Sequence, residues 1–251
     1  MMNGLYSAAS GMRAQQTAMD VVANNLANAT TTGFKRDRVD LVDLDYRAEL
    51  LARGGAAQVG LGSAPGRIAK EHGQGTLSET GRDLDVAIRG EGFLQVVRPD
   101  GTLAYTRAGN LQVDALGRVG LPGGELLQPR IAVPAGAADL AIAPDGTVSA
   151  DVNGARRALG RIETAAFANP AGLRALGDSQ FAATANSGAA VLGAPGAGGR
   201  GALVQGALEA SNVEVGAEMI ALITTQRAFE AASKVVAAGD EMMGIANGLR
   251  R

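Results

Sequence analysis

Residues 215–243, VGAEMIALITTQRAFEAASKVVAAGDEMM, decide the fold, because an apolar residue recurs at every seventh position. Two turns of an α-helix take about 7.2 residues, so positions seven apart share one face. The same spacing recurs near the N-terminus. The two stripes consist of Leu5, Met12, Met19 and Leu26, with Val22 beside them, and of Val215, Leu222, Phe229, Val236 and Met243. They predict two long terminal helices with apolar faces for assembly.

The predicted helices span residues 3–28 and about 212–248. Thr30-Thr31-Thr32-Gly33 ends the first by β-branching and a φ-permissive glycine, and Asn212 is expected to cap the second. Each helix would be roughly 40–50 Å long at 1.5 Å per residue, which exceeds the diameter of a small β domain. Such helices could also be core elements of an ordinary globular protein. Their length favours burial against each other or against neighbouring subunits.

Composition excludes several classes of protein. The 251 residues are 46% hydrophobic but only 3% aromatic, so the core must be aliphatic. The net charge of −2 gives no basic face for nucleic acid, and the absence of cysteine excludes disulfides. The N-terminal segment lacks both a basic n-region and an apolar run of signal-peptide length. We therefore expect neither a cleaved signal nor insertion into a membrane.

The middle of the chain is predicted to be β-rich. Short apolar or alternating segments are separated by turn signals, including Pro-Asp-Gly at 99–101 and again at 144–146. The predicted strands lie at residues 84–89, 93–97, 103–107, 110–114, 140–143, 148–152 and 161–167. Such strands are typical of an antiparallel sandwich or barrel. The expected fold class is therefore α+β, with long terminal helices packed together and an inserted antiparallel β domain.

This pattern predicts four parts of the chain. Residues 35–70 fit neither helical nor strand periodicity and indicate a loop or an extended arm. Residues 186–201 are rich in glycine and alanine and indicate a linker or loop. The predicted organisation is a discontinuous helical domain (1–34 plus 211–251), a connecting segment or arm (35–74), a β-rich domain (75–185) and a return linker (186–210).

Motifs for chemistry are weak. Residues 196–201 match the letters GxGxxG, and Glu218 lies about 20 residues further on, but the acid falls inside a predicted helix. His72 is the only histidine, and we interpret it as a polar loop residue. The pairs Asp83/Asp85 and Asp43/Asp45 are interpreted as solvated surface carboxylates. We therefore expect no catalytic residue, cofactor or metal site. The alternative is an enzyme or binding module that uses Asp83, Asp85 and His72.

Three segments resemble the flagellar rod and hook protein family. Residues 7–36, SAASGMRAQQTAMDVVANNLANATTTGFKR, resemble its N-terminal signature, in which NNLAN precedes a short Thr/Ser stretch and GFK. Residues 75–119 are similar to its central β region. Residues 206–243 resemble its C-terminal signature, with SNV before the helix and QRAFE inside it. These segments cover somewhat under half of the chain and follow the family's order.

The resemblance implies a structural subunit without catalysis. Such proteins are exported through the flagellar type III apparatus and stack into a helical homopolymer, a hollow rod across the periplasm. Their partners are neighbouring rod and hook proteins and the surrounding bushing rings. The length fits a distal or proximal rod member, and residues 110–114 and 225–230 look more like the distal members. One departure is that the stretch between Tyr46 and Gly60 is shorter than the usual distal arm.

Overall fold

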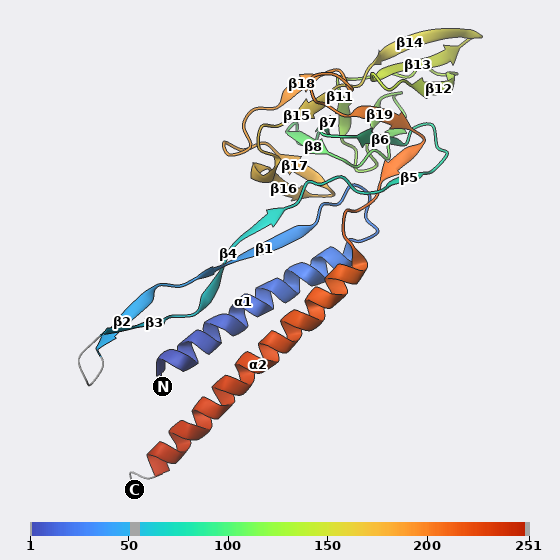
Figure 1. Cartoon of the computed structure of the whole chain (residues 1–251). Helices are drawn as coiled ribbons and strands as arrows, with labels where there is room; N and C mark the ends of the chain where they lie inside the picture. Colours follow the sequence, from blue (N-terminus) through green and yellow to red (C-terminus); the bar gives the residue numbers. More distant parts are fainter. Residues whose placement is uncertain (1, 51–55, 249–251) are drawn as a thin grey trace. The chain divides into compact units, whose positions relative to one another are not determined.

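The computed structural model describes residues 2–50 and 56–248 of the chain, and these divide into two units. Residues 2–27, 37–50, 56–70 and 214–248 form what we call the helical unit. Asn28–Arg36 and Glu71–Val213 form the β unit. Figure 1 shows the two helices of the first unit and the sheets of the second. The predicted α+β fold class is confirmed.

The helical unit contains two long antiparallel helices, α1 (Met2–Ala27) and α2 (Val215–Gly248). They lie side by side (Figure 1) and match the predicted spans to within three residues at the described ends. The prediction that Asn212 caps α2 is wrong. Its side chain accepts a hydrogen bond from Arg36 N at 2.8 Å and donates to Glu71 O at 2.8 Å. Asn212 thus connects backbone segments inside the β unit.

A two-stranded ribbon completes the helical unit. Strand β1 (Asp37–Asp43) pairs antiparallel with β4 (Ser63–Lys70), and β2 (Tyr46–Leu50) pairs with β3 (Ala56–Gly60). The register of β1 and β4 shifts between Asp40 and Leu41, which breaks the alternation of side chains along the strand. None of the residues of β1 and β4 is fully buried, so these strands lack the strict alternation of a core strand, which explains why they escaped sequence prediction.

The β unit holds four separate sheets among its described residues. The largest has nine strands, in the order β16-β17-β8-β7-β11-β10-β9, with β15 bridging β7 and β18. Its members are β7 (Phe93–Val97), β8 (Leu103–Thr106), β9 (Gln112–Val113), β10 (Val119–Gly120), β11 (Leu126–Gln128), β15 (Thr164–Ala166), β16 (Arg174–Gly177), β17 (Gln180–Ala182) and β18 (Val191–Gly193). A short 3-10 helix spans Pro170–Gly172.

The β unit also contains three smaller sheets, and the last strands before α2 belong to two of them. A three-stranded sheet joins β12 (Ala138–Ile142), β13 (Thr147–Val152) and β14 (Ala155–Arg161). Strand β19 (Ala202–Gln205) pairs with β6 (Val86–Arg89), and β20 (Ala207–Glu209) pairs with β5 (Leu77–Glu79). The glycine-rich stretch predicted to be a linker or loop thus contributes β18 to the large sheet. Strand β14 was also missed, because its residues are mostly exposed and do not alternate.

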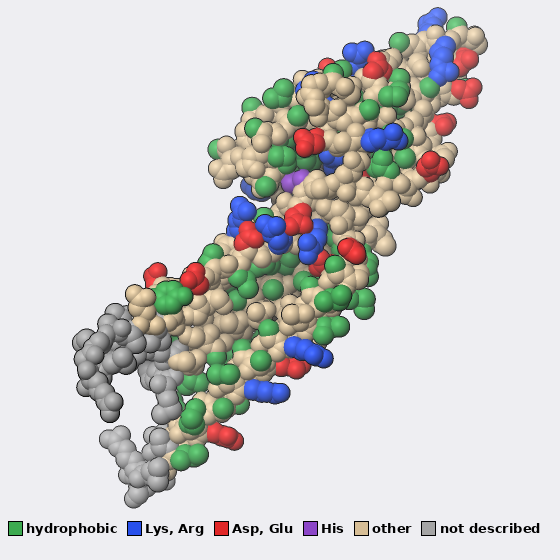
Figure 2. Space-filling view, in the orientation of Figure 1, with side chains coloured by type: hydrophobic (Ala, Val, Ile, Leu, Met, Phe, Trp, Pro, Cys, Tyr) green, Lys and Arg blue, Asp and Glu red, His purple; other side chains and the backbone are tan. Residues whose placement is uncertain are grey.

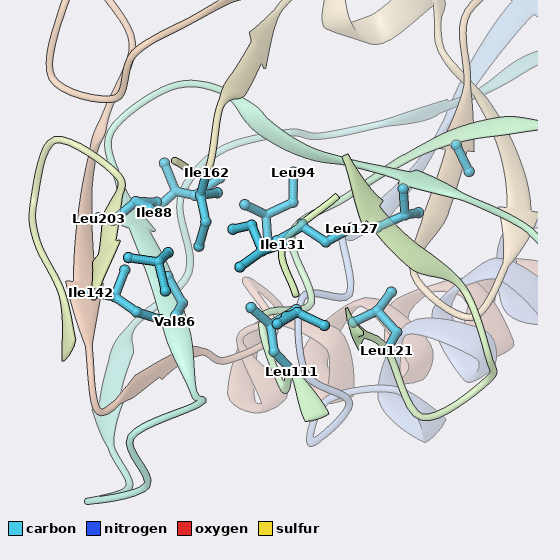
Figure 3. Packing of buried hydrophobic residues seen from close by; sticks show 14 residues of the cluster. Val86, Ile88, Leu94, Leu111, Leu121, Leu127, Ile131, Ile142, Ile162 and Leu203 are labelled. Atoms are coloured by element: carbon cyan, nitrogen blue, oxygen red, sulfur yellow. The ribbon is translucent and has the colours of Figure 1, made fainter. Parts of the chain in front are cut away.

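The main core of the β unit is aliphatic, as composition predicts. Figure 3 shows Val86, Ile88, Leu94, Leu127, Ile131, Ile162 and Leu203 among the side chains that meet in it. A second cluster gathers the few aromatic residues, with Phe93, Tyr105 and Phe181 buried in it. Strand β7 is buried over four successive residues, which explains why Phe93–Val97 reads as a continuous apolar run.

Candidate assembly surface

The two helices approach closely along one line of α2. Glu218 and Gly239 are buried and lie three heptads apart, with Thr225 and Ala232 between them on the same line. Leu5 of α1 packs directly against Gly239, where an added Cβ would meet the leucine methyl group. The small side chains on this line allow the close approach. The predicted stripe through Leu222 is displaced from this line by four residues.

The predicted seam residues are covered to different degrees within the unit. Leu5, Met12, Met19, Val22 and Leu26 are half-buried on α1, as are Leu222, Phe229 and Val236 on α2. Val215 is 45% exposed and Met243 is 38% exposed, so the ends of the second stripe are open. Most of the predicted seam residues thus lie on partly covered sides of the two helices. Whether these residues contact neighbouring subunits stays a prediction.

Asn25 connects three segments of the helical unit and was missed by the sequence reasoning. Its amide exchanges two hydrogen bonds of 2.8 Å with the backbone of Asp37 at the start of β1. The same amide donates to the carboxylate of Glu218 on α2 at 3.2 Å. Asn25 and Glu218 are both buried. Two sequence features could have indicated this contact: Asn25 lies near the end of a predicted helix, and Glu218 is an acidic residue within the apolar pattern of the other.

A second face of α1 packs on the ribbon. Ser7 Oγ donates to Gly60 O at 3.2 Å, and the Cα of Ser7 lies 3.0 Å from where a Cβ on Gly62 would be. Ala14 and Val21 are buried further along this side of the helix. Serine, alanine and valine at these spacings form a second, less apolar stripe that heptad counting does not detect.

The outer side of α2 carries an apolar surface with no cover in the described chain. Six large side chains on it are half or more exposed: Met219, Ile220, Ile223, Val235, Met242 and Ile245. We call these six residues the outer face of α2. Figure 2 shows apolar side chains among a few charged ones along the helical unit. A series of large exposed apolar side chains along one helix is typical of an interaction surface.

An open groove of about 560 Å³ runs between α1 and the ribbon. Tyr6, Arg13 and Asp20 line it from the helix, and Leu44 and Pro65 line it from the ribbon. Its walls mix charged, polar and apolar groups. The helical unit therefore presents a second accessible surface in addition to the outer face of α2.

The GFK residues at 33–35 are buried in the β unit. Gly33 has φ +66°, and a Cβ there would lie 2.5 Å from Ala108 N, so only glycine fits. Lys35 Nζ contacts Glu209 Oε1 at 2.5 Å and donates to Gly73 O at 2.7 Å. Burial is the largest influence on Lys35 and lowers its pKa, although the carboxylate of Glu209 opposes the shift.

Two chemical interpretations from the sequence are corrected by the structure. Asp85 is buried, and its Oδ2 accepts a hydrogen bond from Thr80 Oγ1 at 2.7 Å, so it is no solvated carboxylate. His72 lies in a loop, as expected, but its ring packs edge-on against Phe93 and Phe181, with centroids 5.5 and 5.1 Å away, so its surroundings are aromatic and not polar. Asp85 is bonded to Thr80 and His72 packs against aromatic rings. Neither contact supports the alternative catalytic site.

The glycine motif at 196–201 forms a turn. Gly196 N donates to Gly201 O at 3.1 Å, and strand β19 follows directly. A dinucleotide site requires a helix N-terminus at that point. Within residues 2–50 and 56–248, no group of three His, Asp or Glu side chains is arranged to hold a metal ion.

Comparisons with known proteins identify the family. The flagellar basal-body rod protein FlgG of Caulobacter vibrioides is 41% identical to the chain, and the alignment covers 99% of this chain and 100% of that protein. FlgG of Borreliella burgdorferi is 40% identical, with all of both chains covered. The chain belongs to the FlgG family of flagellar basal-body rod proteins. It is a structural rod subunit, as the resemblance predicted.

Family models match this rod subunit in three places. They are described as flagella basal body rod protein (residues 5–35), flagellar hook protein FlgE/F/G D1 domain (87–150) and flagellar basal body rod FlgEFG protein C-terminal (204–249). The flagellar hook protein FlgE of Treponema pallidum is 44% identical over 47% of this chain and 27% of its own length. The matched ends contain most of α1, all of α2 and the buried residues Asn25, Lys35, Glu209 and Glu218. None of the described helices is long and apolar enough to cross a membrane.

Proposed function

We propose that this rod subunit polymerises helically with copies of itself into a hollow distal rod. The observation that carries the proposal is the outer face of α2, which the described chain leaves uncovered. A second copy is the expected occupant, because the relatives of this chain are rod proteins. A heterologous contact that does not close on itself generates a helical filament.

Assembly and ordering would be coupled. An isolated amphipathic helix is marginal in water, so the terminal segments are expected to be disordered before assembly. They would fold as they bind neighbouring copies, since the contact supplies the apolar burial that a lone helix lacks. This behaviour also suits a subunit that must be exported unfolded through the flagellar type III apparatus, without a cleaved signal.

The polymer would act as a drive shaft that transmits torque and lets exported subunits pass through its lumen. Its neighbours would be other rod proteins, the hook and the bushing rings in the periplasm. Residues 110–114 and 225–230 favour the distal position. The proximal position is the alternative, and electron microscopy of purified basal bodies that locates this chain along the rod distinguishes the two. No catalytic step is proposed.

Charged substitutions on the helices test this function. We expect Met19→Asp, Leu222→Asp and Ile223→Asp each to abolish rods and swimming, because a carboxylate would enter an apolar contact at a cost of several kcal/mol. The β unit should stay folded, as judged by its methyl NMR spectrum. Leu116→Asp is the matched control, because Leu116 is 74% exposed on a turn of the β unit. It should assemble normally.

The three helix variants also separate two surfaces. Ile223 belongs to the outer face of α2, whereas Leu222 is half-buried beside the line that meets α1. Normal rods and motility in Ile223→Asp would contradict the proposed contact between copies. Normal assembly of both Met19→Asp and Leu222→Asp would contradict the role of the helix seam.

A further inference from the structure

A polar cavity in the β unit has no role in the assembly described above. Its volume is about 380 Å³. It is lined by Thr31, Thr32, Ala108, Asn110, Leu121, Pro122, Gly123, Glu125, Asp178, Ser179 and Gln180. The lining contains two carboxylates, a hydroxyl-rich wall and two side-chain amides, but no Lys, Arg or His. Its side chains therefore offer mainly hydrogen-bond acceptors and negative charge.

Glu125 is the central group of this cavity. It follows the turn between β10 and β11, which Leu121 N closes by donating to Glu125 O at 2.8 Å. A Cβ on Gly123 would lie 2.6 Å from the carboxylate, so the glycine leaves room for it. Only 6% of Glu125 is exposed, yet no described Lys, Arg or His forms an ion pair with it. Burying a carboxylate without a cation is costly.

Gln180 supplies a second acceptor that lacks a partner. Its Nε2 donates to Glu125 Oε1 at 2.7 Å, which fixes the orientation of the amide. Its Oε1 accepts no hydrogen bond, and only 3% of the residue is exposed. Buried amide oxygens are normally hydrogen-bonded, so an unpartnered one beside an unpaired carboxylate indicates a missing donor.

The wall that carries Gln180 is held in place. Asp178 and Ser179 form the tight turn between β16 and β17, with φ of 50° and 55°. Ser179 Oγ donates to Thr32 O at 3.0 Å, and Thr106 Oγ1 donates to Ser179 O at 2.8 Å. These bonds fix Asp178 at the exposed rim, next to the buried Gln180. The acceptors are thus arranged before any ligand arrives.

We propose that this cavity binds an alkylguanidinium or alkylammonium group. Such a group carries several N–H donors and a positive charge, which match the free acceptors of Glu125 and Gln180. The cavity volume is about 13 times the roughly 30 Å³ that a water molecule occupies in the liquid, which suits a side-chain-sized cation. The group could be a small free cation or an arginine or lysine side chain of a second copy.

Titration of the full-length chain with methylguanidinium chloride tests this site. The readout is the side-chain amide signal of Gln180 by NMR, with sodium chloride at matched ionic strength as reference. We expect a saturable shift that sodium chloride does not produce. Glu125→Gln should weaken binding at least tenfold, whereas Glu91→Gln, an exposed acid of the same unit, should leave it unchanged.

Two further arms keep the test decisive. Asp178 is exposed, so Asp178→Asn should weaken binding severalfold without loss of fold, even if Glu125→Gln is poorly folded. Repeating the titration at rising protein concentration distinguishes the sources: apparent affinity falls if a second copy supplies the cation and stays constant if a small molecule does. A non-saturable response, or equal binding by all variants, overturns the site. Neither result bears on rod assembly by the helices.

Discussion

At the scale of single residues, the buried carboxylate of Glu209 organises the start and end of the β unit. It contacts Lys35 at 2.5 Å and Arg107 at 3.1 Å, and it accepts a hydrogen bond from Gly75 N at 2.9 Å. Arg107 also lies over the Phe93 ring, 5.3 Å from its centroid. One carboxylate therefore compensates two buried cations, and its loss should cost more than the loss of either cation.

This charge balance predicts that removing the carboxylate of Glu209 destabilises the β unit more than removing the ammonium group of Lys35. Glu209→Gln should lower the free energy of unfolding of the β unit by about 3–5 kcal/mol, because two buried cations lose their counter-charge. Lys35→Met should cost less, about 1–3 kcal/mol, since Glu209 keeps Arg107 and Gly75. Urea unfolding followed by the methyl NMR signals of Leu94 and Leu127 measures both. Glu79→Gln, at an exposed site, is the control, and a larger loss in Lys35→Met would contradict the scheme.

The lowered pKa of Lys35 predicts a pH dependence. Between that pKa and the ordinary value of 10.5, the unfolded chain holds a proton that the folded chain has lost. Unfolding then takes up a proton, so stability rises with pH across this window and the gain is complete above 10.5. Urea unfolding of the unsubstituted protein at several pH values should show this rise in the free energy of unfolding. Lys35→Met should remove it, and an identical pH profile in both would exclude Lys35 as the source.

At the scale of elements, α1 has two packed sides and the ribbon depends on one of them. Gly62 has φ +106°, and a Cβ there would meet Ser10 Oγ and the backbone of Ser7. Glycine is required both for the backbone conformation and for the contact. The helix pair was predictable because its heptads are regular. The ribbon was not, because a bulge, Pro65 and Gly66 interrupt its pattern.

A pair of glycine substitutions separates these two requirements. Gly101 also has positive φ, +84°, but a Cβ there would meet nothing within 4 Å. Gly101→Ala should therefore cost about 1–2 kcal/mol for the backbone conformation alone. Gly62→Ala should in addition displace the ribbon from α1. We expect it to reduce hydrogen-exchange protection of α1 in assembled rods and to impair swimming, while Gly101→Ala swims normally.

Unchanged protection of α1 in Gly62→Ala would contradict the role of this contact. It would mean that the ribbon can shift by enough to admit a methyl group. Val21 and Ala14 are buried on the same side of α1, so protection should be lost there first.

At the scale of the whole molecule, the chain forms two units whose segments alternate along the sequence. Residues 28–36 belong to the β unit although they directly follow α1, and residues 37–70 return to the helical unit. Asn25 and Lys35 lie ten positions apart, yet each is buried in a different unit. The four-part division of the chain expected from the sequence remains a prediction.

If the helices fold only on assembly, we expect the β unit to be ordered and the helical unit disordered in the unassembled chain. In dilute full-length protein, amides of β7 and β8 should be strongly protected from hydrogen exchange, because these strands lie inside the nine-stranded sheet. Amides of α1 and α2 should exchange rapidly until rods form. Slow exchange of both helices in the dilute monomer would contradict coupled folding and assembly. The exchange of β7 serves as the internal reference.

The sequence by itself determined the two long helices, most of the strands between residues 86 and 152, the aliphatic core and the family resemblance. These features follow from local periodicity, turn residues and composition, which act over a few positions. Only the tertiary structure decided the ribbon, the burial of Asp85, the aromatic contacts of His72, the contact of Asn25 with Glu218 and the pairing of Lys35 with Glu209. Each depends on groups that meet across many positions of the chain, up to 193 for Asn25 and Glu218. A buried polar side chain is stable only beside its partner, and a single residue in a sequence does not reveal which partner it will meet.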